Sequence, residues 1–182
     1  VYTSVKLGGS GHLNPAVTIA LAATGAFKSS LVASYLLAQL AGAFTGAVLV
    51  WLTYNKHFEA SSDADLKKAI FCTAPAIRSP LHNLITEFIG TFVLMFGALA
   101  FTPATTSLGT LDALPVTLLV LGIGLSLGGP TGYAINPARD LGPRIAHFLL
   151  PIPGKRDSDW RYSWIPIVGP IAGALLAAWL FG

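Results

Sequence analysis

The chain has 182 residues, of which 53% are hydrophobic and only 10% are charged, and its formal net charge is +3. A soluble domain carries about 25% charged residues, so a mean hydropathy of +0.67 excludes an ordinary soluble domain and indicates an integral membrane protein. The basic residues are too few to form a nucleic-acid-binding face, which excludes that class of partner.

The first element in chain order, 9–28, has a glycine-rich lead-in and then an amphipathic run. We expect residues 1–8 to be the tail of an earlier span, with further sequence upstream of Val1. Asn is a strong helix N-cap and Pro suits the first helical position, so Asn14–Pro15–Ala16 predicts a helix start. A helix of about 10–14 residues is ~15–20 Å long and crosses about half of a ~30 Å hydrocarbon core.

Four stretches are apolar enough to be complete membrane helices, which need about 20 mostly apolar residues each. They cover about 31–54, 83–101, 113–129 and 162–181. Runs of this length are too long for single strands of a barrel, so the sequence predicts an all-α bundle. The connection 55–80 is polar and of mixed charge, and 151–161 is predicted to be a solvated loop.

A second copy of the tripeptide, Asn136–Pro137–Ala138, follows another glycine-rich lead-in and predicts a second half-length helix over 130–150. Two of the spans carry glycines four residues apart, Gly42 with Gly46 and Gly169 with Gly173. Small residues at this spacing let helices approach closely, and we expect both pairs to serve contacts within one protomer.

This repetition divides the chain into part of a first repeat (1–54), a connection (55–80) and a second repeat (81–182), all within one membrane domain. Three spans per complete repeat is an odd number, so the second repeat would be inverted in the membrane. Inverted repeats with interrupted helices place a site near the bilayer midplane. The two half-length helices would meet there, with Asn14 facing Asn136.

With its two Asn-Pro-Ala motifs in inverted halves, the sequence resembles the aquaporin (major intrinsic protein) family over essentially its whole length. It looks like the aquaglyceroporin, or glycerol uptake facilitator, branch in having Asp140 after "NPAR", Arg144 four residues later, and Pro166–Ile167 opening the last span. Phe71–Pro75, "FCTAP", also resembles a loop motif of that branch, although Ala74 replaces a frequent aromatic. The resemblance implies a homotetramer in the cell membrane with one pore per protomer.

The resemblance also implies roles for single residues. Arg139 would line the narrowest part of the pore, Tyr133 would contribute to this constriction as an aromatic wall, and Gly124 would lie opposite, where a glycine leaves space for a polyol. Asp140 is expected to hold a loop or Arg144.

Two further residues are expected to support this site. Glu87 would accept backbone N–H groups from the irregular loop before Asn14, as the matching glutamate of the family does. His12 would line the pore or brace a loop rather than act as a pH-dependent gate. The family's remaining constriction aromatic would precede Val1.

The expected function is a passive channel for glycerol, other small neutral solutes and water, which excludes protons and ions because two positive helix ends face the pore. One alternative is a water-selective aquaporin, and another is a secondary transporter with broken helices that uses Glu87 or Asp140 as its coupling acid. No nucleophile–base pair or metal cluster stands out, so we expect neither an enzyme nor a cofactor. Basic residues usually mark the cytoplasmic side, yet they gather in 55–80 and 151–161, which the family topology places outside.

Overall fold

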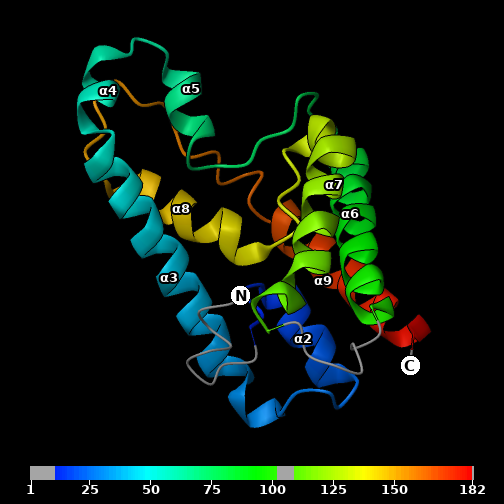
Figure 1. Cartoon of the computed structure of the whole chain (residues 1–182). Helices are drawn as coiled ribbons and strands as arrows, with labels where there is room; N and C mark the ends of the chain where they lie inside the picture. Colours follow the sequence, from blue (N-terminus) through cyan, green and yellow to red (C-terminus); the bar gives the residue numbers. More distant parts are fainter. Residues whose placement is uncertain (1–10, 102–108, 182) are drawn as a thin grey trace.

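The structure, a computed structural model, describes residues 11–101 and 109–181, and within these ranges it contains helices and loops but no strand. The all-α prediction is therefore confirmed, while the predicted span tail over 1–8 lies outside the described residues. Figure 1 shows α3 (Val32–Thr53) on one flank and α6 (Pro80–Ala100), α7 (Leu114–Thr131) and α9 (Ile165–Phe181) on the other. The short helices α2 (Pro15–Ala23) and α8 (Pro137–Leu149) lie between the flanks.

The four predicted spans correspond to α3, α6, α7 and α9, and their ends differ from the prediction by a turn or less. Short 3₁₀ turns, η1 (Ser29–Leu31) and η2 (Gly109–Ala113), precede α3 and α7. By length and composition, three helical stretches of the described residues are long and apolar enough to cross a membrane: Ser29–Thr53, Pro80–Ala100 and Leu111–Thr131. α9 is a shorter apolar helix of 17 residues.

The polar connection 55–80 is more structured than the sequence indicates, because it contains α4 (Asn55–Ala60) and α5 (Ala64–Ala69). The Asp63 side chain begins α5 by accepting from the backbone N–H groups of Asp65 and Leu66, both at 2.9 Å. This cap is a local signal that the composition of the whole segment conceals.

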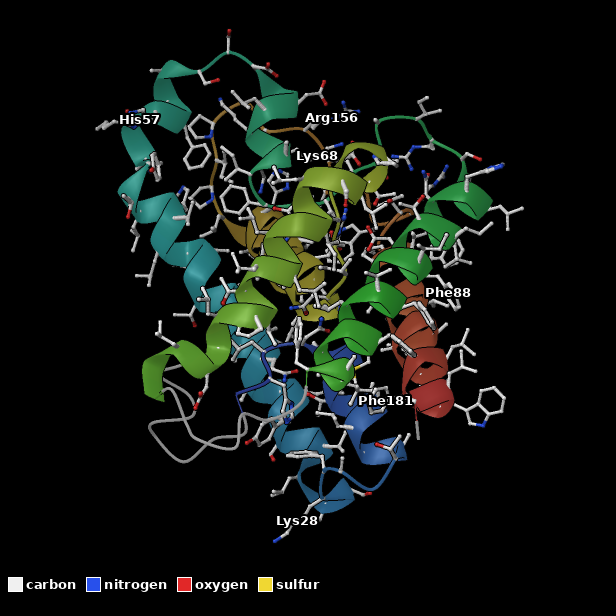
Figure 2. The ribbon with its side chains drawn as sticks, turned by 45° about the vertical axis from the view of Figure 1, so that its right-hand side comes forward. Lys28, His57, Lys68, Phe88, Arg156 and Phe181 are labelled. Atoms are coloured by element: carbon white, nitrogen blue, oxygen red, sulfur yellow. The ribbon has the colours of Figure 1, made fainter. Side chains whose placement is uncertain are left out.

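The connection 151–161 was expected to be solvated, and this is wrong for part of it, since Ile152 and Ser158 are buried. The segment packs against α5, where the Lys67 ammonium donates to the Pro153 carbonyl and Arg156 pairs with Asp65. Both connections therefore lie at one end of the molecule. In Figure 2, Lys68 and Arg156 stand at this end and Lys28 at the opposite one.

Glycines bring α9 against α6. A Cβ built at Gly173 would lie 2.2 Å from the Phe88 carbonyl oxygen, and one at Gly169 would lie 2.9 Å from the Glu87 Cβ. Any larger residue would separate the two helices, so the predicted contact role of this glycine pair is confirmed.

The other glycine pair behaves differently. Within the described part of the chain, nothing lies within 4 Å of a Cβ built at Gly42 or Gly46. The expected close contact at this pair is therefore wrong for the described residues, where α3 instead presents its small residues to a cavity. α3 packs on α8 beside that cavity, at Gly142, where an added Cβ would lie 2.7 Å from the Ala43 Cβ.

Candidate functional site

The site begins with two helix starts of the same chemistry. The Asn14 side chain accepts from the Ala16 N–H at 3.0 Å and begins α2, whose first residue is Pro15. The Asn136 side chain accepts from the N–H groups of Ala138 and Arg139, at 3.0 and 3.3 Å, and begins α8. Both predicted half-length helices are present, with 9 residues in α2 and 13 in α8.

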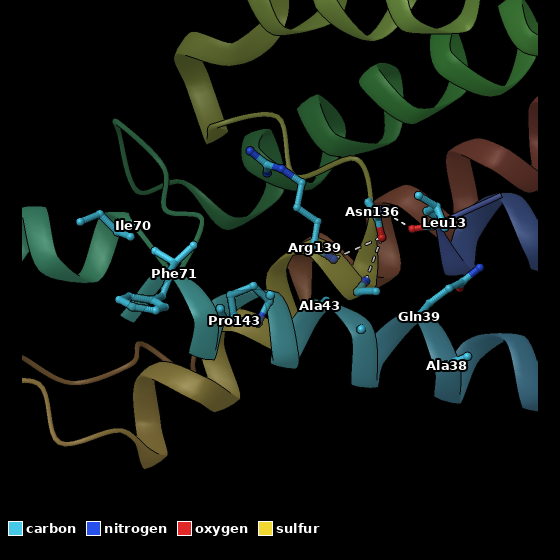
Figure 3. A pocket seen from close by; sticks show the side chains of 14 residues that line it. Leu13, Ala38, Gln39, Ala43, Ile70, Phe71, Asn136, Arg139 and Pro143 are labelled. Atoms are coloured by element: carbon cyan, nitrogen blue, oxygen red, sulfur yellow. Dashed lines mark hydrogen bonds between the residues drawn. The ribbon is translucent and has the colours of Figure 1, made fainter. Parts of the chain in front are cut away.

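The two starts are joined by a reciprocal pair of hydrogen bonds. Asn14 Nδ2 donates to the Ile135 carbonyl at 2.7 Å, and Asn136 Nδ2 donates to the Leu13 carbonyl at 2.9 Å. Each amide thus binds the residue that precedes the other asparagine, as Figure 3 shows for Asn136 and Leu13. The N-termini of α2 and α8 meet head to head, so their two positive dipole ends point at one place.

A cavity of about 620 Å³ opens beside this junction, between α3 and α8. Its wall on α3 is formed by small or apolar residues and by Gln39, and its opposite wall includes Asn136 and Arg139. Figure 3 shows the polar groups of this second wall near the junction and the apolar Phe71 and Pro143 farther along. The cavity therefore offers a mainly apolar wall facing a few hydrogen-bond donors.

Arg139 is exposed and its guanidinium carbon lies 4.7 Å from the centre of the Tyr133 ring. Its Nη1 donates to the Gly132 carbonyl at 3.3 Å. The lead-in to α8 makes this stacking possible, because Tyr133 takes a positive φ of 38° that only a few residues tolerate. Two of the predicted site residues, Arg139 and Tyr133, are thus in contact.

Gly124 has a different role from the expected one. The sequence predicts that this glycine leaves space opposite Arg139, but the Tyr133 ring fills that space. A Cβ at Gly124 would lie 3.1 Å from the Tyr133 Cζ, and one at Gly128 would lie 2.9 Å from its Cδ1. The positive φ of Tyr133 turns its side chain back toward α7, and Gly124 and Gly128 leave room for the ring against that helix.

Glu87 on α6 also differs from the prediction, which assigned it to the loop before Asn14. Its carboxylate instead accepts from the N–H groups of Ala134 and Ile135, at 2.9 and 2.7 Å, and from the Thr131 hydroxyl at 2.6 Å. This is the loop before Asn136. α6 packs on α7 and α9, and the loop before Asn136 follows directly from the end of α7. Glu87 is therefore close to this loop.

Asp140 and Arg144 form an ion pair one turn apart on α8, and neither side chain has any exposed surface. Arg144 Nε donates to Asp140 Oδ2 at 2.8 Å, and Asp140 Oδ1 accepts from the Thr73 N–H at 3.0 Å. Arg144 also donates to the carbonyls of Thr73, at 2.8 Å, and Asp159, at 3.0 Å. The expectation that Asp140 holds a loop or Arg144 is confirmed, since it holds both.

Several residues of the site have no signal in the sequence pattern. Gln39 and Thr18 bind the loop that carries His12, and Lys155 donates to the carbonyls of Phe148 and Leu150, at 2.9 and 2.7 Å, where α8 ends. Each is a single polar residue whose role depends on the partner that the fold brings to it, so spacing alone does not reveal it. Among the described residues, no three His, Cys, Asp or Glu side chains are grouped to hold a metal ion.

The comparisons with known proteins agree with this geometry. The probable glycerol uptake facilitator protein of Thermotoga maritima is 56% identical over 185 residues, which cover 100% of this chain and 78% of the relative. The glycerol uptake facilitator protein of Streptococcus pneumoniae strain R6 is 52% identical over 183 residues, covering 100% and 76%.

The fold resembles the X-ray structure of the aquaglyceroporin from Plasmodium falciparum, with a TM-score of 0.82 and 28% identity over 95% of this chain and 72% of that one. Residues 1–181 match the family described as major intrinsic protein. The chain belongs to the major intrinsic protein family.

Proposed function

We propose that the protein is a passive membrane channel for glycerol and other small neutral solutes, and for water, which excludes protons and ions. The observation that carries the proposal is the reciprocal bonding of Asn14 and Asn136, which sets two helix N-termini head to head beside a cavity. Two relatives that are more than half identical to this chain are named glycerol uptake facilitators. A family of channels also supports a function without enzymatic chemistry.

The junction can exclude cations and bind neutral solutes at the same time. Each helix N-terminus carries about half a positive charge, so a proton or metal ion would meet two repulsive ends. A side-chain amide has two hydrogens, and the reciprocal bonds use one from each asparagine. The second hydrogen of Asn14 and of Asn136 is available to a solute oxygen that passes between them.

Arg139 and Tyr133 supply the second part of the mechanism. The guanidinium has five N–H donors and is always charged, so it binds hydroxyl oxygens and repels cations. The Tyr133 ring, seated against Gly124, offers an apolar surface next to those donors. A polyol has a face of C–H groups and a face of hydroxyls, and this pair of side chains would contact both.

The two acids that a coupled transporter would need are already engaged. Glu87 accepts three hydrogen bonds, two of them from backbone N–H groups. Asp140 is paired with Arg144 and bound to Thr73. A coupling acid has to take up and release a proton in each cycle, and both carboxylates would lose their partners by doing so. Passive permeation is therefore favoured over proton-coupled transport.

We further propose that the channel works as a homotetramer in the cell membrane, with the site residues of each pore coming from one protomer. The apolar outer surfaces of α3 and α7, which include Leu37, Leu49, Leu118 and Leu125, would contact lipid or a neighbouring protomer. Cross-linking in liposomes would give the number of subunits.

The function is tested with the purified protein in liposomes that are shrunk by a sudden glycerol gradient and followed by light scattering. We expect fast shrinkage as water leaves and then fast re-swelling as glycerol enters, with no dependence on a pH gradient. Arg139→Ala should slow the re-swelling. Fast shrinkage with re-swelling no faster than in bare lipid would instead establish the water-selective alternative.

A further inference from the structure

A cluster of hydrogen bonds around the first Asn-Pro-Ala goes beyond the pore residues described above. Gln39 extends from α3 to the start of α2, where its Nε2 donates to the His12 carbonyl at 3.0 Å and lies 2.9 Å from Thr18 Oγ1. Thr18 Oγ1 lies 3.1 Å from the Asn14 carbonyl oxygen and 2.8 Å from His12 Nδ1. The cluster therefore joins one span, one half-length helix and the loop before it.

The direction of each bond follows from a single fixed acceptor. A backbone carbonyl can only accept, so the His12 carbonyl requires Gln39 to present its amide nitrogen rather than its oxygen. This nitrogen has two hydrogens, and the second one is donated to Thr18 Oγ1. The threonine hydroxyl has one hydrogen of its own, which goes to the Asn14 carbonyl.

His12 can then complete the cluster in one way only. If its Nδ1 were unprotonated, the hydroxyl hydrogen of Thr18 would have to serve both this nitrogen and the Asn14 carbonyl, and one bond would be lost. With a proton on Nδ1, every bond of the cluster is made. The bonding requirements thus select the Nδ1–H tautomer.

The other side of the ring agrees with this assignment. His12 Nε2 is buried and has no hydrogen-bond partner among the residues that the structure describes, and the ring lies between Phe27, edge-on at 4.7 Å, and Tyr35, stacked at 4.9 Å. An N–H group without an acceptor is rarer in protein interiors than an acceptor without a donor. A lone pair on Nε2 therefore suits this enclosure better than a second proton, and the ring is neutral.

We propose that Thr18 and Gln39 are positioning residues that hold Asn14 in place for permeation. Thr18 fixes His12 as its neutral Nδ1–H tautomer, and Gln39 holds Thr18 and the His12 carbonyl. Asn14 makes four hydrogen bonds: its Oδ1 accepts from the Ala16 N–H, its Nδ2 donates to the Ile135 carbonyl, and its own carbonyl accepts from both the hydroxyl and the backbone N–H of Thr18. The part concerning permeation rests on the proposed channel function, whereas the tautomer does not.

The tautomer is measured first, by ¹⁵N NMR of the histidine-labelled protein in lipid. The chain has four histidines, and loss of one signal in His12→Asn identifies the one from His12. We expect protonated Nδ1 and unprotonated Nε2. In Thr18→Val we expect the Nε2–H form to appear, while Thr18→Ser, which keeps the hydroxyl, should retain the original signal.

Permeability is measured next in the same variants. We expect Thr18→Val and Gln39→Met to lower glycerol permeability about fivefold, which corresponds to about 1 kcal/mol in the barrier, and Thr18→Ser to restore it. Thr91→Val is the matched control, because Thr91 is also fully buried and its hydroxyl also donates to the carbonyl four residues earlier, that of Glu87, at 2.8 Å. This control should pass glycerol at the original rate.

Two results would overturn the proposal. One is an Nε2–H signal for His12 in the unsubstituted protein, a test that needs no variant to fold. The other is unchanged permeability in folded Thr18→Val and Gln39→Met. A protein that shows the Nδ1–H signal but passes no glycerol would overturn the channel function and leave the tautomer assignment supported.

Discussion

The two half-length helices start alike and are anchored by different chemistry. α2 and α8 both begin with Asn and Pro, and each asparagine binds the loop before the other helix. The resemblance ends after the alanine, and four residues after the asparagine α2 has Thr18 where α8 has Asp140. Thr18 belongs to a neutral hydrogen-bond cluster, whereas Asp140 belongs to a buried ion pair.

This difference follows from what each helix has to hold. The anchor of α2 binds one neighbouring span and its own loop, through groups that carry no charge. The anchor of α8 binds two long connections, at Thr73 and at Asp159, through several backbone groups. A guanidinium has enough donors to bind both connections at once, and Asp140 makes its burial possible. The helix that carries Arg139 is therefore tied to the loops at one end of the molecule.

The largest loss of folding stability is expected from breaking the ion pair of α8 with Asp140→Asn. The change leaves the Arg144 guanidinium buried without its counter-charge, a type of change that costs about 3–5 kcal/mol. Thr18→Val, at the matching position of α2, removes only neutral bonds and should cost about 1–3 kcal/mol. Unfolding of both variants in mild detergent measures the difference.

Asp65→Asn is the control for charge removal. Asp65 also pairs with an arginine, Arg156, but the side chains are 70% and 46% exposed, and such pairs contribute about 0–1 kcal/mol. If Asp140→Asn destabilised the protein no more than Asp65→Asn does, the two anchors would not differ in the way described here.

The next effect concerns the helices that flank α2 and α8. Gly173→Ala should destabilise the protein by about 1–3 kcal/mol, because the new Cβ would lie 2.2 Å from the Phe88 carbonyl oxygen and push α9 from α6. Gly46→Ala on α3 meets no described atom within 4 Å and should be neutral or slightly stabilising. If thermal unfolding showed the same loss of stability in both variants, the two glycine pairs would not differ in how closely their helices pack.

The starts of α2 and α8 could be predicted because helix capping is a local property. A capping asparagine binds N–H groups two or three residues ahead, so its sequence pattern and its structure coincide. The four spans were predictable for a similar reason, since a long apolar run needs no information about its partner. The cap of α5 by Asp63 is equally local, but the polar composition of 55–80 concealed it.

The errors concern contacts that do not follow from the local spacing of residues in the sequence. Glu87 binds a loop 47 and 48 residues away, at Ala134 and Ile135, and nothing around Glu87 in the sequence tells that loop from the one before Asn14. Gly124 was expected to leave a space, because a pattern shows that a side chain is missing but not which other side chain occupies its place. Only the positive φ of Tyr133 turns its ring into that position.

A smaller effect tests how Tyr133 is seated before α8. In Gly128→Ala the new Cβ would lie 2.9 Å from the Tyr133 Cδ1, so the ring should move toward Arg139. We expect glycerol permeability to fall about five- to tenfold, or about 1 kcal/mol in the barrier, and water permeability to fall less. Light scattering in liposomes gives both rates. Gly129→Ala is the matched control, since no described atom lies within 4 Å of its Cβ, and a similar loss there would contradict this seating of the ring.

The smallest effect is confined to alkaline pH and concerns the loop that Asp140 holds. Burial raises the pKa of the Cys72 thiol to about 12, against an ordinary value of 9.0, although the nearby Arg144 guanidinium lowers it. Ionisation therefore favours the unfolded state, and the contribution of Cys72 to stability should be complete below about pH 9 and be lost as the pH rises toward 12.

Because the thiolate is the reactive form, iodoacetamide at pH 8.5 should modify Cys72 in folded protein at least about tenfold more slowly than in unfolded protein. Asp140→Asn removes the charge of the ion pair that holds Thr73, next to Cys72, and should raise the rate in folded protein, while Thr18→Val at the α2 anchor should leave it unchanged. Equal rates in these two variants would mean that the loop is not held by the ion pair of α8.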